Sequence, residues 1–189
     1  YIEDYHYKLE NGQYLYKKYG SPFLIAKIGF YDPTLPAFGI KVYAAVNQGK
    51  LSVEQVEQKP QFVDKVETQY YKISLNSDGS LNIFDKETNT EYAKVNTYED
   101  MADDGDEYDY GPLVNDKPFY STNCKAKWEI LKDNDLFVEF VAKISFEIPE
   151  KLIGSIDVPR VRSEQLKPLD ITTKYRIYKN LKHIEITTE

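Results

Sequence analysis

"YKISLNSDGSLNIF", residues 71–84, decides the fold class of this chain. Apolar and polar residues alternate over its first five positions, and Leu81 and Ile83 resume the alternation after "NSDGS". A period of two is typical of a strand whose two faces meet different environments. Gly79 can adopt the positive φ that a tight turn needs. The stretch therefore predicts a β-hairpin over residues 69–84.

The same alternation recurs in the second half of the chain. Five apolar residues at alternate positions mark one face of a strand over 138–146, whereas the other face is apolar only near its start, at Phe137 and Val141. We therefore expect this strand to lie between two layers at its start and to meet water at its end. Residues 171–187 predict another hairpin, with "KNLK" as its turn. Because no window longer than about ten residues carries a helical stripe, the sequence predicts an all-β, sandwich-like fold.

Three segments follow from the distribution of these patterns. Residues 1–47 predict a small β-sandwich-like block, and the polar residues 48–65, rich in Gln and Lys, predict a connector. From residue 66 to 189 the hairpin pattern is sustained. Within it, 147–170 contains three prolines and predicts a long exposed loop. The chain begins with Tyr1 rather than Met and ends inside a predicted strand, so we expect a piece of a longer protein.

The composition excludes several classes of function. The 189 residues carry a net charge of −7, which argues against nucleic acid or an anionic membrane as partner, because either would favour a basic face. His6 and His183 lie at opposite ends and form no metal-binding pattern, so we expect no self-contained zinc site. The lone Cys124 has no partner for an internal disulfide, and we expect a cytoplasmic protein without a membrane span.

A second stretch, "YEDMADDGDEYDYGPL" (98–113), contains seven carboxylates and no basic residue. An EF-hand with Gly105 at loop position 6 would place Ala102 at position 3 and Gly111 at position 12, so that motif is excluded. A pair of glycosidase acids needs groups on opposite sides of a sugar, which neighbouring residues of one loop rarely provide. An irregular calcium site stays open as an alternative, with these ligands: Asp103, Asp104, Asp106 and Glu107.

A loop that contacts carbohydrate is the third interpretation. Carboxylates accept hydrogen bonds from sugar hydroxyls, and tyrosine offers a flat apolar face with a polar tip. Asp106, Tyr108, Asp109 and Tyr110 have this composition. The alternative is a solvated acidic turn whose tyrosines pack on the sheet, and local chemistry leaves both open. We expect Asp103 and Asp104 to be solvated.

The order of the motifs resembles glycoside hydrolase family 38, the α-mannosidases, in its bacterial members. "LPAFGIKVYAAV" (35–46) is similar to the family's proline–glycine strand, and "YYKISLNSDGSLNIFDKETNTEY" (70–92) to its "DG…DK" hairpin. The acidic stretch resembles the family's "ED…GDEY" segment. The closing "TTKYRIYKNLKHIEITTE" resembles a strand pair of the large β-domain.

The resemblance implies a zinc-dependent, retaining α-mannosidase whose metal ligands and nucleophile lie outside this chain. It implies a small β-sandwich followed by the first part of a galactose-mutarotase-like β-supersandwich. It places Tyr108 as the β-domain tyrosine that reaches the active site beside the zinc, supported by Asp106 and Asp109. We therefore expect no catalytic residue and no metal ligand here, and a mannoside substrate bound through the rest of the enzyme, whose oligomeric state stays open.

A carbohydrate-binding or interaction module that acts alone is the alternative function. The N-terminal tyrosines could form a stacking platform for it, or they could be the amphipathic strand faces of a domain boundary. These tyrosines are Tyr1, Tyr5, Tyr7, Tyr14 and Tyr16.

Overall fold

The structure is a computed structural model that describes residues 61–155 and 158–189, with residues 158 and 159 described by their backbone alone. Before residue 61 it describes the backbone of four short strands, together with residues 32, 34 and 39–43. The chain divides into two compact units. The first is Tyr1–Gln58 with Asn134–Leu136, and the second is Lys59–Asp133 with Phe137–Glu189.

The first unit contains two pairs of antiparallel strands. β1 (Ile2–Asp4) pairs with β4 (Ala26–Ile28), and β2 (Tyr16–Lys18) pairs with β3 (Ser21–Phe23). Most of the predicted sandwich block and residues 48–60 of the predicted connector lie outside the described residues. The division at residues 47 and 65, and the tyrosine platform, therefore stay predictions.

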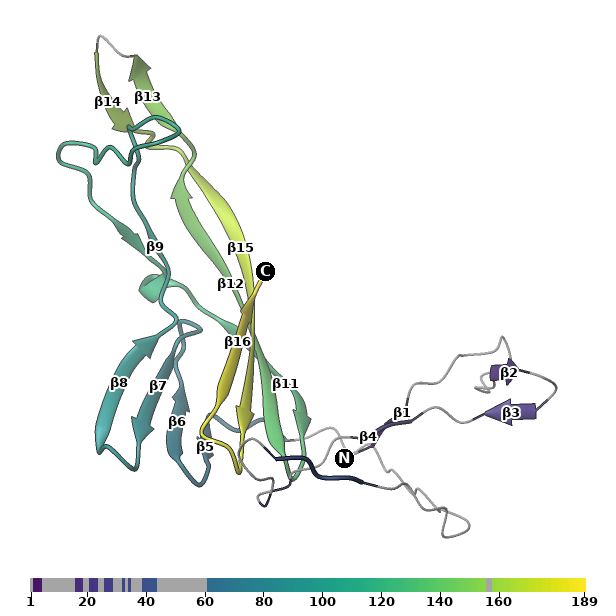
Figure 1. Ribbon diagram of the computed structural model, residues 1–189. Helices are drawn as coiled ribbons and strands as arrows, with labels where there is room; N and C mark the ends of the chain where they lie inside the picture. Colours follow the sequence, from purple (N-terminus) through teal and green to yellow (C-terminus); the bar gives the residue numbers. More distant parts are fainter. Residues whose placement is uncertain are drawn as a thin grey trace. The chain divides into compact units, whose positions relative to one another are not determined.

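The second unit is built on two four-stranded antiparallel sheets, which Figure 1 shows as β5–β8 and as the group around β12 and β15. The predicted hairpin over 69–84 is confirmed, since β6 and β7 pair from Tyr71 opposite Asp85 to Leu75 opposite Leu81. The strands of the first sheet, in order, are β5 (Lys65–Glu67), β6 (Tyr71–Leu75), β7 (Leu81–Asp85) and β8 (Thr90–Val95).

The second sheet is dominated by two strands of 13 residues that pair along their whole length. β12 is buried on both faces over 137–142 and alternates between buried and exposed from Lys143 to Glu147, as the sequence predicts. The hairpin predicted around "KNLK" is confirmed as β15–β16. The strands, in order across the sheet, are β11 (Lys127–Asp133), β12 (Phe137–Pro149), β15 (Leu166–Tyr178) and β16 (Ile184–Thr188).

The prediction of a long loop over 147–170 is wrong. β12 and β15 extend into this segment from both ends, and β13 (Leu152–Ser155) pairs with β14 (Val158–Arg162) between them. Pro168 is tolerated because, among the described strands, only β12 and β15 pair at its level, so the outer edge of β15 there needs no N–H donor. The prolines therefore mark edge positions and not the absence of strands.

The all-β prediction is confirmed for the described residues, whose only helical segment is a single 3₁₀ turn, η1 (Ser121–Asn123). In that part of the chain there is no helix with the length and apolar character to cross a membrane.

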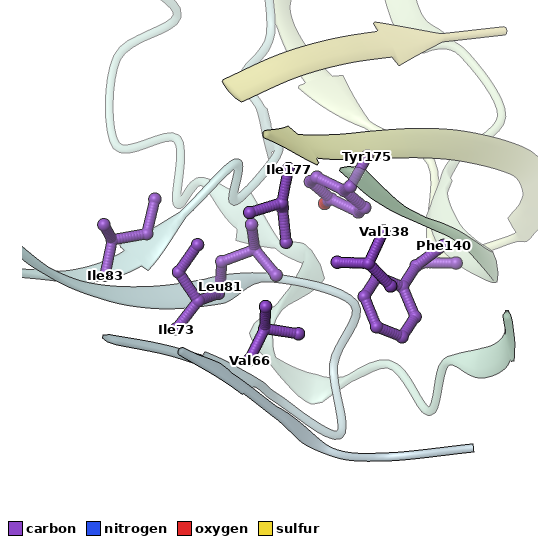
Figure 2. Close-up of a cluster of buried hydrophobic side chains, with 9 residues drawn as sticks. Val66, Ile73, Leu81, Ile83, Val138, Phe140, Tyr175 and Ile177 are labelled. Carbon is purple, nitrogen blue, oxygen red and sulfur yellow. The ribbon is translucent and has the colours of Figure 1, made fainter. Parts of the chain in front are cut away.

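The two sheets enclose an apolar cluster, seen in Figure 2. Ile73 and Leu81 of the first sheet face Phe140 and Ile177 of the second, and all four are almost completely buried. Burial of side chains of this size stabilises by about 1.5–3 kcal/mol each before the cost in entropy. Trp128 packs on this cluster, with its ring centre 5.5 Å from that of Tyr175.

One buried polar contact joins the sheets within this apolar core. The hydroxyl of Tyr175 in β15 donates to the carbonyl of Gly79, in the β6–β7 turn, at 2.7 Å. Gly79 has a φ of +89°, a conformation that favours glycine, and a Cβ there would also lie 3.1 Å from the Ile144 side chain, which would have to shift. The Trp128 indole donates to the Asn76 carbonyl of the same turn at 2.8 Å. The turn is therefore fixed on the second sheet.

We predict that Tyr175→Phe lowers the free energy of unfolding by about 1–3 kcal/mol, because it leaves a buried carbonyl without its donor. Urea unfolding followed by the fluorescence of Trp128, the only tryptophan, measures the change. Tyr178→Phe is the matched control, because that hydroxyl bonds the exposed Glu185 from the same strand. We expect the control to lose at most about 0.5 kcal/mol. Equal losses in both variants would contradict the role of the Tyr175 contact.

The same contact predicts a dependence of stability on alkaline pH. Burial raises the pKa of Tyr175 to about 12 from an ordinary value of 10.0. The unfolded chain therefore ionises first, and the contribution of Tyr175 is complete below pH 10 and is lost as pH rises toward 12. We expect the stability difference between the wild type and Tyr175→Phe to narrow between pH 9 and 11.5. Parallel stability curves over that range would refute this assignment.

Candidate functional site

The acidic loop, residues 101–118, connects two short paired strands. β9 (Glu99–Asp100) pairs with β10 (Phe119–Tyr120), so the loop leaves and re-enters the fold at one place. Just outside these strands, the Tyr98 N–H donates to the Ser121 hydroxyl at 3.0 Å, and the Ser121 N–H donates to the Tyr98 carbonyl at 3.0 Å. These bonds close the base of the loop.

A chain of side-chain hydrogen bonds ties this base to the sandwich. Asn96 adopts a φ of +66°, which Asn tolerates better than most residues. Its amide nitrogen donates to the hydroxyls of Tyr98 and Tyr175, both at 2.8 Å. The Tyr98 hydroxyl lies 2.6 Å from that of Thr173 in β15. The start of the acidic stretch is therefore bonded to the same tyrosine that joins the two sheets.

Asp103 fixes the shape of the loop. One of its carboxylate oxygens accepts hydrogen bonds from the backbone N–H groups of Gly111 and Gly105, each at 2.9 Å. These two donors lower the pKa of the Asp103 carboxyl. A Cβ at Gly105 would lie 1.8 Å from the Asp109 carbonyl oxygen, and one at Gly111 would lie 2.6 Å from the Gly105 nitrogen. The loop therefore closes on itself only because both positions are glycine.

Asp106 shapes the tip of the loop, residues 106–110. Its carboxylate accepts from the backbone N–H groups of Tyr108 and Asp109, each at 2.9 Å, and these bonds lower its pKa. Tyr108 is 85% exposed and Tyr110 is 57% exposed. The four predicted binding residues thus lie together at the tip, and Asp106 sets the backbone beside Tyr108. The alternative in which Tyr108 and Tyr110 pack on the sheet is wrong for Tyr108, because a packed side chain would not be 85% exposed.

Asp103 and Asp104 are both exposed, as predicted, but each also has a partner within the protein. Asp103 is occupied by the two glycine N–H groups, and Asp104 forms an ion pair with Arg160 at 2.6 Å. The irregular calcium site would need four carboxylates to converge, but those of Asp103 and Asp106 accept backbone N–H groups and that of Asp104 pairs with an arginine. Across the described ranges, no three or more His, Cys, Asp or Glu side chains lie together in a way that could hold a metal ion.

Two arginines of β14 contact the loop, and sequence reasoning missed both. Arg162 forms an ion pair with Asp100, and its other guanidinium nitrogen lies 3.2 Å from the Asp100 carbonyl and 3.6 Å from the Asp116 carboxylate. The only signal in the sequence was the alternation of Arg160, Val161 and Arg162, and the neighbouring prolines argued against a strand there. Figure 1 shows the loop after β9 beside the β13–β14 hairpin.

Comparison with known proteins supports the predicted resemblance. Residues 66–189 match the family model described as "Glycosyl hydrolases family 38 C-terminal domain". A protein of Halalkalibacterium halodurans, named as a mannosylglycerate hydrolase, is 24% identical over 135 residues, which cover 66% of this chain and 15% of that protein. This chain thus spans about one-seventh of the length of that relative.

Two solved structures from Enterococcus faecalis have a similar fold. The first, an α-mannosidase of strain V583, has a TM-score of 0.62 at 22% identity and is matched over 66% of this chain and 15% of its own. The second, a protein of glycosyl hydrolase family 38, has a TM-score of 0.61 at 22% identity, over 66% of this chain and 16% of its own. At this identity the likeness shows the fold alone. Because the family model matches well over half of the sequence, the chain belongs to glycosyl hydrolase family 38, with residues 66–189 in its C-terminal domain.

Proposed function

We propose that this chain is a non-catalytic β-domain region of a zinc-dependent, retaining α-mannosidase, in which the acidic loop forms part of the active-site rim. The substrate class that we propose is an α-mannoside. The name of the H. halodurans relative adds mannosylglycerate as a specific candidate. We also propose a cytoplasmic location, which the unpaired Cys124 permits.

The proposal rests on one observation: Tyr108 has an exposed side chain on a backbone that is held by hydrogen bonds. A side chain that is 85% exposed stands on a backbone that two carboxylates, Asp103 and Asp106, hold through four hydrogen bonds of 2.9 Å. An exposed tyrosine on an unrestrained loop would lose much of its binding energy to ordering. Here the backbone is ordered before any ligand binds, so Tyr108 is suited to bind a partner.

The chemistry of the tip suits a sugar. The Tyr108 ring offers an apolar face to sugar C–H groups, and its hydroxyl can donate to or accept from a sugar hydroxyl. Asp109 is exposed beside it, and its side-chain oxygens can accept hydrogen bonds from sugar hydroxyls. Such contacts accelerate the reaction only if they strengthen in the transition state. We therefore assign Tyr108 and Asp109 to substrate contact, Tyr110 to the neighbouring edge, and Asp106 to supporting the backbone.

Zinc enters this proposal only through the rest of the enzyme. The described residues offer no group of His, Cys, Asp and Glu side chains that could bind it. On the family resemblance, we propose that the metal ligands lie outside this chain, and we derive no step here through the metal.

We predict that Tyr108→Phe in the full-length enzyme lowers kcat/KM for an aryl α-mannoside by about ten- to a hundredfold, the scale of one or two good hydrogen bonds. Steady-state kinetics with an aryl α-mannoside and with mannosylglycerate measure the effect and compare the two substrates. The phenylalanine keeps the ring, so the variant isolates the hydroxyl.

Tyr92→Phe is the matched control, because Tyr92 is 50% exposed and lies on β8 of the first sheet. We expect its kcat/KM to equal that of the wild type. Wild-type kinetics in Tyr108→Phe would remove this residue from the active site. Saturable binding of mannosides to residues 1–189 alone would favour an independent binding module.

A further inference from the structure

We propose that Arg162 is a positioning residue, which holds the acidic loop so that Tyr108 faces the substrate. This inference rests on the proposed function, because it assigns to Arg162 an effect on catalysis through Tyr108. Arg162 lies in β14, about fifty residues along the chain from Tyr108, and it contacts the loop at both of its ends.

The first contact is at the entrance to the loop. The Arg162 guanidinium forms an ion pair with the Asp100 carboxylate, and it also lies 3.2 Å from the Asp100 carbonyl oxygen. It lies over the Phe119 ring as well, 4.9 Å from the ring centre. Asp100 and Phe119 are paired across β9 and β10. One side chain therefore holds both strands from which the loop starts.

The second contact is at the exit from the loop. The Asp116 carboxylate lies 3.6 Å from the Arg162 guanidinium and accepts the backbone N–H of Ala102 at 2.8 Å. The side chains of Arg162 and Asp116 are 11% and 7% exposed. Ala102 is buried as well. Arg162 therefore neutralises two carboxylates that would otherwise repel each other in a largely desolvated place.

Arg160 makes a third contact, closer to the tip. It pairs with Asp104 at 2.6 Å, next to the Asp103 that closes the loop. Both side chains are 34% exposed, so this pair contributes less than a buried one. The chain has only three arginines, and two of them contact this loop. Arginine suits the task because its planar guanidinium can serve several acceptors at once, which lysine does less well.

Two sets of residues restrict the loop in different ways. Asp103 and Asp106 bond the loop to itself, and they fix its shape but not its direction. Arg162 and Arg160 bond it to β14 and fix where the tip points. Removing Arg162 therefore leaves Tyr108 chemically intact on a loop whose direction is less restricted.

Hydrogen exchange of the full-length enzyme tests the structural half of this inference without reference to activity. We expect Arg162→Ala to raise the exchange rate of the loop amides, including Ala102 and Tyr108, by about tenfold or more. Arg162→Lys should restore part of the protection, and Arg160→Ala should give a smaller increase confined to the tip. Tyr92→Phe serves again as the control. Unchanged exchange in a folded Arg162→Ala variant would overturn the proposal.

A double-mutant cycle on kcat/KM tests the catalytic half. If Arg162 acts through Tyr108, Arg162→Ala combined with Tyr108→Phe loses no more activity than the larger of the two single losses. Independent losses that multiply in the double variant would overturn the assignment of Arg162 as a positioning residue for Tyr108. Arg162→Lys provides a second cycle if Arg162→Ala does not fold. A Tyr108→Phe variant without any effect would refute the proposed function instead, and the exchange rates would still report on the Arg162 contacts.

Discussion

The hydrogen bond from the Tyr175 hydroxyl to the Gly79 carbonyl is the contact on which the arrangement of the sandwich depends. Apolar faces attract without direction, so the side chains between the sheets would tolerate more than one relative placement. The buried Tyr175 hydroxyl restricts that placement, because moving the sheets apart or sideways would leave the Gly79 carbonyl without its donor. Gly79 makes this possible, since a side chain there would be strained and would press against Ile144.

The same hydroxyl links the fold to the site. The amide of Asn96 has two hydrogens, and it donates to Tyr175 in the core and to Tyr98 at the start of the acidic stretch. A continuous series of hydrogen bonds therefore runs from the β6–β7 turn through the Tyr175 hydroxyl and the Asn96 amide to Tyr98 at the base of the loop. Within the described residues no buried side-chain nitrogen or oxygen lacks a partner. The entrance to the acidic loop is thus as well determined as the core itself.

The sequence predicted the strands and hairpins, because these depend on residues that are close together along the chain. Alternation predicted the β6–β7 and β15–β16 hairpins, because a sheet with two different faces requires a period of two. It failed over 147–170, where prolines at free edges resembled a loop. No local rule could pair Arg162 with Asp100, which lies 62 residues earlier, because the pairing depends on how two hairpins pack. The position of Tyr108 on the loop was predictable, but the residues that direct the loop were not.

The density of carboxylates in the acidic stretch now has a physical account that requires no bound cation. Asp103 and Asp106 are satisfied by backbone N–H groups, which build the turn in place of regular secondary structure. Asp100 and Asp104 are satisfied by arginines from another hairpin. Because the stretch has no basic residue of its own, its carboxylates pair with arginines that lie elsewhere in the sequence. Beside these paired charges the loop presents a neutral side chain, Tyr108, which is 85% exposed. The Tyr108 ring can stack on the apolar face of a sugar, while the exposed Asp109 beside it can accept hydrogen bonds from sugar hydroxyls.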